Sequence, residues 1–187
     1  MRIISGNLKG KKILLPKNKL TRPLKDLTKE SIFNIIKHSK LLNTNLENSN
    51  ILDLFSGVGS FGLECLSRGA LSVTFLENYK KVLSVLKKNI DNLKLQNYSH
   101  IIEKDIFEIS TLKSLHNQFD IIFIDSPYKE KRLSNLLNII IDLKLLNENG
   151  VIIIHRHKKE DDNFPNNFKI ILEKSYGISK IIFGSAV

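Results

Sequence analysis

The segment Asp125-Ser126-Pro127-Tyr128 combines an acidic side chain, a turn fixed by proline and an aromatic ring directly after an apolar run. The carboxylate and the backbone carbonyl of Ser126 offer acceptors for two N–H donors, and the Tyr128 ring offers a face on which a flat base stacks. These groups form a receptor for a planar base that carries an amino group. A surface Ser-Pro turn is the alternative. Because ligands of open α/β sheets bind beyond the carboxyl ends of the strands, the position favours the receptor.

A glycine-rich turn forms a second candidate site. It follows the apolar run 51–54 and leads into residues suited to a helix, which is the order of strand, turn and helix in nucleotide-binding sites. A turn that merely happens to be rich in glycine fits the same spacing, so the motif needs support from the rest of the chain. Its candidate cofactor-binding residues are Asp53, Phe55, Ser56, Gly57, Gly59 and Gly62.

Two further acidic residues lie near predicted strand ends. Glu77 follows Gly57 by twenty residues, where a carboxylate accepts hydrogen bonds from both ribose hydroxyls of a nucleoside. An ordinary charge at a strand end is the alternative. Asp105 has two equally natural roles, because it is able to accept a hydrogen bond from an adenine amino group or to cap a helix. Ile106 follows it and is placed to pack against the ring.

The elements that must position these residues alternate between short apolar runs and helical stretches. Such alternation predicts an α/β fold with a mostly parallel sheet covered on both faces. The tail has two apolar runs and no helix between them, which predicts an antiparallel hairpin at the sheet edge. The expected strands are 51–54, 71–76, 101–102, 119–124, 151–154, 169–172 and 180–183, with helices over 79–95 and 133–146. Residues 50–187 form the main domain.

The N-terminal segment 1–40 is predicted to be a small basic appendage, made of a β-hairpin and a helix over 25–37 and joined by a polar linker. It has eleven basic residues against two acidic ones, within a chain whose net charge is +10. This clustering favours a polyanionic partner. A solvated lysine-rich surface, produced by biased amino-acid usage, is the alternative. The candidate nucleic-acid-binding residues, which would bind RNA in the family that the chain resembles below, are Arg2, Lys9, Lys11, Lys12, Arg22 and Lys29.

Composition excludes several other classes of protein. The 187 residues suit one domain, and no apolar run reaches the roughly 20 residues of a membrane span. The N-terminus has no secretory signal pattern, so we expect a cytoplasmic protein. Cys65 is the single cysteine and fits a buried position. His155 and His157 alternate on one strand without further ligands, so we expect no metal. Arg156 between them is interpreted as a phosphate contact.

Taken together, these motifs resemble the class I S-adenosylmethionine-dependent methyltransferases that modify amino groups, whose fourth motif usually reads Asp or Asn, Pro, Pro, Tyr. More narrowly, the chain resembles the RsmD family, which methylates the exocyclic amine of one guanine in 16S ribosomal RNA. The order and spacing of the matching residues carry the resemblance across essentially the whole chain. They are 1–6, 9–10, 21–23, Asp26, 30–34, 52–57, 66–70 and 176–177.

The resemblance implies a Rossmann-like methyltransferase fold with a seven-stranded sheet and S-adenosylmethionine as cofactor. The implied partner is 16S ribosomal RNA, within a small-subunit or assembly particle. Glu77 would then hold the ribose, Asp105 would lie near the adenine, and the turn 57–62 would meet the amino-acid portion. Asp125 and the Ser126 carbonyl would orient the target amine toward the methyl group.

The chain departs from the family pattern at four positions. Ser126 replaces the usual first proline but keeps the backbone carbonyl, so we expect methyl transfer to survive. Leu24, Leu27 and Lys29 stand where a threonine and two arginines are common. An arginine makes bidentate contacts, which a lysine replaces only as a point charge. We therefore expect these substitutions to affect RNA affinity or the choice of site more than methyl transfer.

Two other functions fit part of the pattern. A DNA adenine amino-methyltransferase would use the same fourth motif, which does not distinguish one base amine from another. A noncatalytic RNA-binding assembly factor would retain a degenerate methyltransferase fold. The complete set of cofactor residues argues against the second alternative, and Ser126 argues slightly for it.

Overall fold

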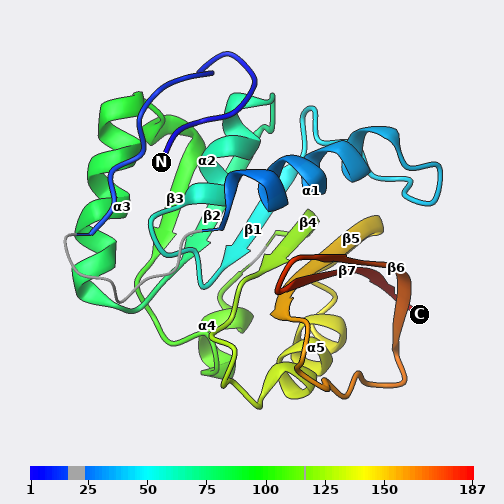
Figure 1. Cartoon of the computed structure of the whole chain (residues 1–187). Coiled ribbons are helices and arrows are strands. Elements are labelled where there is room, and N and C mark those ends of the chain that lie inside the picture. Colours follow the sequence, from blue (N-terminus) through cyan, green and yellow to red (C-terminus); the bar gives the residue numbers. More distant parts are fainter. Residues whose placement is uncertain (17–23, 116) are drawn as a thin grey trace.

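One sheet of seven strands forms the centre of the computed structural model, which describes residues 1–16, 24–115 and 117–187 (Figure 1). The strand order is β3-β2-β1-β4-β5-β7-β6. The first five strands pair in parallel, and β7 and β6 run antiparallel beside β5. The strands are β1 (Asn50–Leu54), β2 (Ser72–Leu76), β3 (Ser99–Ile102), β4 (Phe119–Ile124), β5 (Leu146–His157), β6 (Phe168–Tyr176) and β7 (Ser179–Ala186). The predicted α/β fold and terminal hairpin are confirmed.

Helices cover both faces of the sheet. They are α1 (Asp26–His38), α2 (Ser60–Ser67), α3 (Lys80–Leu93), α4 (Ile109–Lys113) and α5 (Leu133–Asp142), with a 3₁₀ turn η1 (Gln96–Tyr98). Ile51 packs in the core beneath α1, α2 and α3, whereas its neighbour Leu52 packs in the core beneath α4 and α5. Because successive strand side chains point to opposite faces, burial on both faces requires the continuous apolar runs seen in the sequence.

The helix α5 is shorter than predicted and the strand β5 is longer. Lys144 adopts a positive φ of 52°, which ends the helical path two residues after Asp142. Leu145 and Leu146 lie beyond the end of α5 and are buried in the same core that α5 covers. The leucines at 143, 145 and 146 follow the apolar residues of the helix closely, so the sequence pattern gave no signal for the boundary.

The register of the parallel strands places several functional residues at one edge. Leu54 pairs with Leu76 on one side and with Ile124 on the other, and Ile124 pairs with Ile154. The residues that follow these four strand positions are Phe55, Glu77, Asp125 and His155. Phe55, Glu77 and Asp125 therefore leave the sheet at its carboxyl edge, and His155 lies at the same level within β5, which continues to His157.

The N-terminal segment forms a looser structure than the predicted hairpin. Only one antiparallel bridge, between Arg2 and Lys12, joins its two arms in the described part of the chain. The amides of Ile4 and Ser5 instead donate to the Glu64 carboxylate of α2, at 2.8 and 2.9 Å. Backbone bonds from Ile3 N to the Lys11 carbonyl and from Ile13 N to the Met1 carbonyl join the arms, but the ladder does not extend to Ile4 and Ser5, whose amides bind Glu64.

This segment shares a core with the rest of the domain. Ile3 and Ile13 are buried together with Ile32 and Phe33 of α1, in the same apolar cluster as Phe61 of α2. Figure 1 shows the N-terminal segment beside α2 and α3, with α1 on the same side of the sheet. The appendage is thus packed onto the main domain by apolar side chains as well as by Glu64.

Burial rules out one of the predicted RNA contacts. The Lys29 side chain is fully buried, its Nζ lies 3.3 Å from Glu64 Oε2, and it donates to the Arg2 carbonyl. A buried lysine needs such a partner and is closed to an external RNA. The interpretation of Lys29 as an RNA contact is therefore wrong. Its charge anchors α1 and the N-terminal segment to α2.

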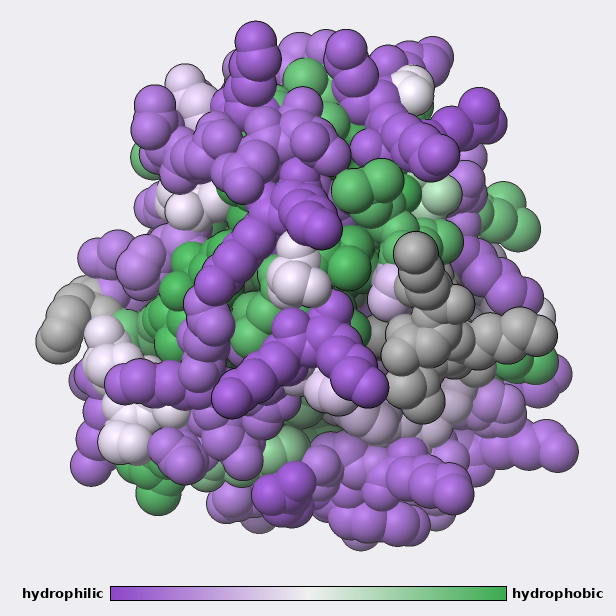
Figure 2. Space-filling model, turned by 90° about the vertical axis from the view of Figure 1, so that its left-hand side faces the viewer, coloured by the Kyte–Doolittle hydropathy of each residue, from purple (hydrophilic) through white to green (hydrophobic). Residues whose placement is uncertain are grey.

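Arg2, Lys9, Lys11 and Lys12 are exposed, and Arg22 lies outside the described residues. The side of the molecule that carries α3 presents mostly hydrophilic side chains (Figure 2). Exposed lysines of α3 add to this face, and they are Lys80, Lys81, Lys87 and Lys88. No helix in the described part of the chain is both long enough and apolar enough to span a bilayer.

Candidate active site

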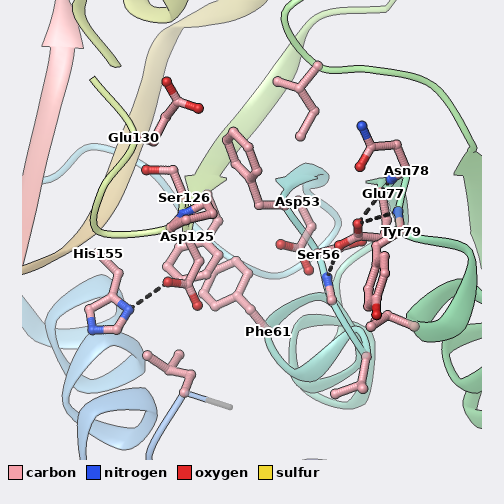
Figure 3. Close-up of a pocket in the computed structure, with 18 of the residues that line it drawn as sticks. Asp53, Ser56, Phe61, Glu77, Asn78, Tyr79, Asp125, Ser126, Glu130 and His155 are labelled. Carbon is pink, nitrogen blue, oxygen red and sulfur yellow. Dashed lines mark hydrogen bonds and ion pairs between the residues drawn. The ribbon is translucent and has the colours of Figure 1, made fainter. Parts of the chain in front are cut away.

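A cavity of about 540 Å³ opens at the carboxyl edge of the sheet (Figure 3). Residues from the ends of β1, β2 and β4 line it, together with the loop before α4 and β5. The structure brings eleven of the predicted site residues to this cavity. They are Asp53, Phe55, Ser56, Gly57, Glu77, Asp105, Ile106, Asp125, Ser126, Pro127 and Tyr128.

The three glycines of the turn have different roles. Gly57 lines the cavity, with a φ of 56°. Gly59 and Gly62 do not line it, and a Cβ on Gly62 would come within 2.4 Å of the Phe75 ring. Gly62 therefore allows α2 to pack closely on β2. Its amide also donates to Asp53 Oδ2 at 3.0 Å, which ties the helix to the end of β1.

Asp53 is an almost fully buried carboxyl group, with 1% of its surface exposed. Burial raises the pKa of Asp53 well above its usual value, the Gly62 amide opposes this change, and the charges of Asp125 and Glu77 add to it. Carboxylates that share a desolvated cavity favour a bound cation. The electrostatics of the cavity therefore suit a positively charged ligand.

Glu77 is held by backbone amides. Its Oε2 accepts from Gly57 N at 2.9 Å, and its Oε1 accepts from the amides of Asn78 and Tyr79 at 3.0 and 2.9 Å (Figure 3). A carboxylate oxygen has further acceptor capacity, so both oxygens remain able to bind a diol. Glu77 also connects the glycine turn of β1 to the start of α3.

The next wall is formed by the loop between β3 and α4. The exposed Asp105 accepts a hydrogen bond from Phe107 N at 3.0 Å, so it caps a turn, whereas α4 begins later, at Ile109. Ile106 is buried with 4% exposure. The Arg132 guanidinium lies 3.6 Å from the centre of the Phe107 ring. This loop thus offers an acidic group beside apolar surface, as a purine site requires.

Sequence reasoning missed Glu130 and Arg132, which also line the cavity. Glu130 accepts two hydrogen bonds from the Arg132 guanidinium, both at 2.8 Å. This contact lowers the pKa of Glu130 to about 2. Their only signal in the sequence was their position a few residues after Tyr128.

Asp125 has a partner that the sequence did not indicate. Nδ1 of His155 lies 2.8 Å from Asp125 Oδ1 (Figure 3). Nε2 of His155 lies 2.9 Å from the Ser179 hydroxyl. The rings of His155 and His157 both meet Tyr128 edge-on. The alternating positions of His155 and His157 in the sequence had indicated that their side chains point to the same side of the strand. Within the described residues, no cluster of three or more His, Cys, Asp or Glu side chains is suited to a metal.

Arg156 is buried, so its interpretation as a phosphate contact is wrong. Its exposure is 1%, and its guanidinium forms an ion pair with Asp162 at 2.8 Å. It also donates to the loop that follows β4, where its acceptors are the Ser126 hydroxyl and the carbonyls of Pro127, Tyr128 and Glu130. Of Ser126 it engages the hydroxyl rather than the carbonyl. Arg156 therefore fixes the shape of this loop from within.

Comparison with known proteins agrees with this geometry. Residues 1–185 match the family described as Conserved hypothetical protein 95. Ribosomal RNA small subunit methyltransferase D of Buchnera aphidicola is 34% identical, over 92% of this chain and 86% of the relative. The protein of that name from Haemophilus influenzae is 33% identical, over 95% of this chain and 90% of the relative.

A solved structure agrees as well. The crystal structure of the methylase HI0767 from Haemophilus influenzae superimposes with a TM-score of 0.76, at 31% identity, and covers 98% of this chain and 96% of that one. The match thus extends from the N-terminal segment to the terminal hairpin. The chain belongs to the Conserved hypothetical protein 95 family, the RsmD family of methyltransferases.

Proposed function

We propose that the protein transfers a methyl group from S-adenosylmethionine to the exocyclic amine of a guanine in 16S ribosomal RNA. One observation carries the proposal. The Asp125 carboxylate shares a cavity with two other carboxylates, Asp53 and Glu77, at the carboxyl edge of the sheet. Family membership and the names of the RNA methyltransferase relatives support the choice of RNA.

The cofactor fits the residues on one side of the cavity. S-adenosylmethionine supplies an electrophilic methyl group on a sulfonium cation. Asp53 and Glu77 favour that cation, and the two oxygens of Glu77 suit the ribose hydroxyls. Asp105 and Ile106 would bind the adenine, and Gly57 gives the amino-acid portion access to backbone.

The target amine fits the other side. This amine is conjugated with its ring and is a poor nucleophile, so catalysis must come from its orientation. Asp125 and the Ser126 carbonyl accept its two N–H groups, while Tyr128 stacks on the base. A paired target must first turn out of its stack. The exposed residues Arg2, Lys9, Lys11 and Lys12 would contact phosphates.

The substrate is tested by comparing three acceptors. Purified protein with methyl-labelled S-adenosylmethionine is given small ribosomal subunits, free 16S RNA and duplex DNA. We expect incorporation into ribosomal RNA, and digestion to nucleosides should yield N2-methylguanosine. Preference for DNA would instead support an adenine methyltransferase. Cofactor binding without transfer to any acceptor would support a noncatalytic assembly factor.

Cofactor affinity should rise with pH above the ordinary aspartate pKa of about 4. The raised pKa of Asp53 means that the free protein keeps this proton to a higher pH than a solvated aspartate does. A bound cation favours the ionised carboxylate, so binding releases the proton and becomes easier as the pH rises. Calorimetry in buffers of different ionisation enthalpy measures that release.

The variant Asp53→Asn should remove the pH dependence. It keeps an acceptor for the Gly62 amide but has no proton to release. The exposed Asp142 provides a matched control, and Asp142→Asn should titrate as the wild type does. Binding without proton release in the wild type would show that Asp53 is already ionised and would contradict the prediction.

A further inference from the structure

The His155 imidazole connects three strands at the cavity. His155 lies on β5, which pairs with β4 on one side and with β7 on the other. Asp125 follows β4 directly, and Ser179 begins β7. His155 is 5% exposed, and both of its ring nitrogens have oxygen partners within 2.9 Å. It therefore joins the Asp125 carboxylate to the opposite strand through one rigid ring.

The chemistry of the partners fixes the proton at one nitrogen. An ionised carboxylate only accepts, so Nδ1 must carry a hydrogen and donate it to Asp125 Oδ1. A serine hydroxyl both donates and accepts. It therefore satisfies Nε2 whether that atom is a bare acceptor or carries a second hydrogen. The contact to Asp125 is thus kept in both protonation states of the ring.

The terminal torsion of an aspartate has broad preferences, so an unrestrained carboxylate turns easily about its last bond. A hydrogen bond from a buried ring to one oxygen removes that freedom. With Oδ1 occupied, Oδ2 is the oxygen left for a ligand in the cavity. The Tyr128 ring meets the His155 ring edge-on, so the imidazole is also held from its side.

We propose that His155 is a positioning residue that aims the Asp125 carboxylate, so that Oδ2 accepts an N–H of the target amine. This role rests on the proposed methyl transfer. A metal-binding role does not compete with it, because both ring nitrogens are engaged in hydrogen bonds. Arg156, the next residue along β5, donates to the Pro127 and Tyr128 carbonyls, so adjacent residues of one strand hold the Asp125 carboxylate and the loop that follows it.

The test compares two variants of similar size. In His155→Asn the amide nitrogen takes the place of Nδ1 and still donates to Asp125, whereas His155→Leu has no donor. We expect His155→Leu to lower kcat about 100-fold, which is the typical cost of a misplaced reacting group. We expect His155→Asn to recover most of that loss. Ser179→Ala, which removes only the outer partner, should have a smaller effect than His155→Leu.

Three measurements make the outcome decisive. Each variant is assayed for kcat and KM with the acceptor that the wild type methylates, for labelled cofactor affinity and for thermal stability. Cofactor affinity should stay within about threefold in every variant, since His155 acts on the acceptor side. His100→Asn, at an exposed position on β3, is the matched control and should behave as the wild type does.

An unchanged kcat in His155→Leu would reject the positioning role. Equal losses in His155→Asn and His155→Leu would reject it as well, because a merely structural ring would give that result. Absence of transfer by the wild type itself, to any of the three acceptors, would reject the proposed function and this role with it. The two failures are therefore distinguished by the wild-type assay alone.

Discussion

Replacing Asp125 with alanine should reduce methyl transfer by about 1000-fold or more while cofactor affinity stays within a few fold. In the proposed mechanism, the side chain supplies one of the two acceptors that orient the target amine, and positioning is the main source of rate. The cofactor residues Asp53 and Glu77 keep their amide partners in the variant. Single-turnover assays with labelled cofactor measure transfer, and calorimetry measures affinity.

Asp125→Asn provides the matched control for this prediction. Asparagine keeps one carbonyl oxygen at the same place, and the fourth motif of amino-group methyltransferases also occurs with Asn. We therefore expect the asparagine variant to retain measurable transfer, well above that of alanine. Undiminished turnover in Asp125→Ala would remove the basis of the proposed mechanism. A large loss of cofactor affinity would instead place Asp125 on the donor side.

Replacing Arg156 with methionine should destabilise the protein by about 3–5 kcal/mol, the cost of leaving one partner of a buried ion pair alone. Asp162 is nearly buried, and its other cation, Lys180, lies 3.9 Å away. The loop after β4 would also lose four hydrogen bonds from the guanidinium. Activity should fall with stability, because this loop carries the acceptors for the amine.

Denaturant unfolding with fluorescence or circular dichroism measures the first effect. Arg156→Lys should recover little, because an ammonium is a point charge and reaches fewer of the loop carbonyls at once. Lys169→Met, which removes an exposed cation from β6, is the control and should leave stability nearly unchanged. An Arg156→Met protein as stable as the wild type would show that the loop is held by other contacts.

The sequence predicted the elements whose signals are local. Continuous apolar runs followed by Asp53, Glu77 and Asp125 placed these carboxylates at one edge of a parallel sheet, and the structure gathers them around one cavity. The glycine spacing predicted the turn, although only Gly57 lines the cavity. Each of these inferences required a pattern within about twenty residues and one general rule about where parallel sheets bind ligands.

The contacts of His155 that sequence reasoning missed depend on the pairing of distant strands. His155 meets Asp125 only because β5 lies beside β4, and it meets Ser179 only because β7 pairs with β5. The same limit applies to charges. Lys29 and Arg156 read as exposed cations in a basic chain, yet Glu64 and Asp162 bind them in the interior. No local pattern distinguishes a buried, paired cation from a solvated one.

The hydrogen bond between Ser179 and His155 affects the order in which parts of the site can form while the chain is being synthesised. The residues proposed to bind the cofactor lie between 53 and 107, whereas the proposed acceptor side is held by contacts of residues 155, 156, 162 and 179. A ribosome that is synthesising this chain releases the first group well before strand β7 emerges. In the proposed mechanism, the nascent protein thus has its methyl-donor residues long before the contacts that position Asp125. Recognition of the target amine would then be the last property that the growing chain acquires.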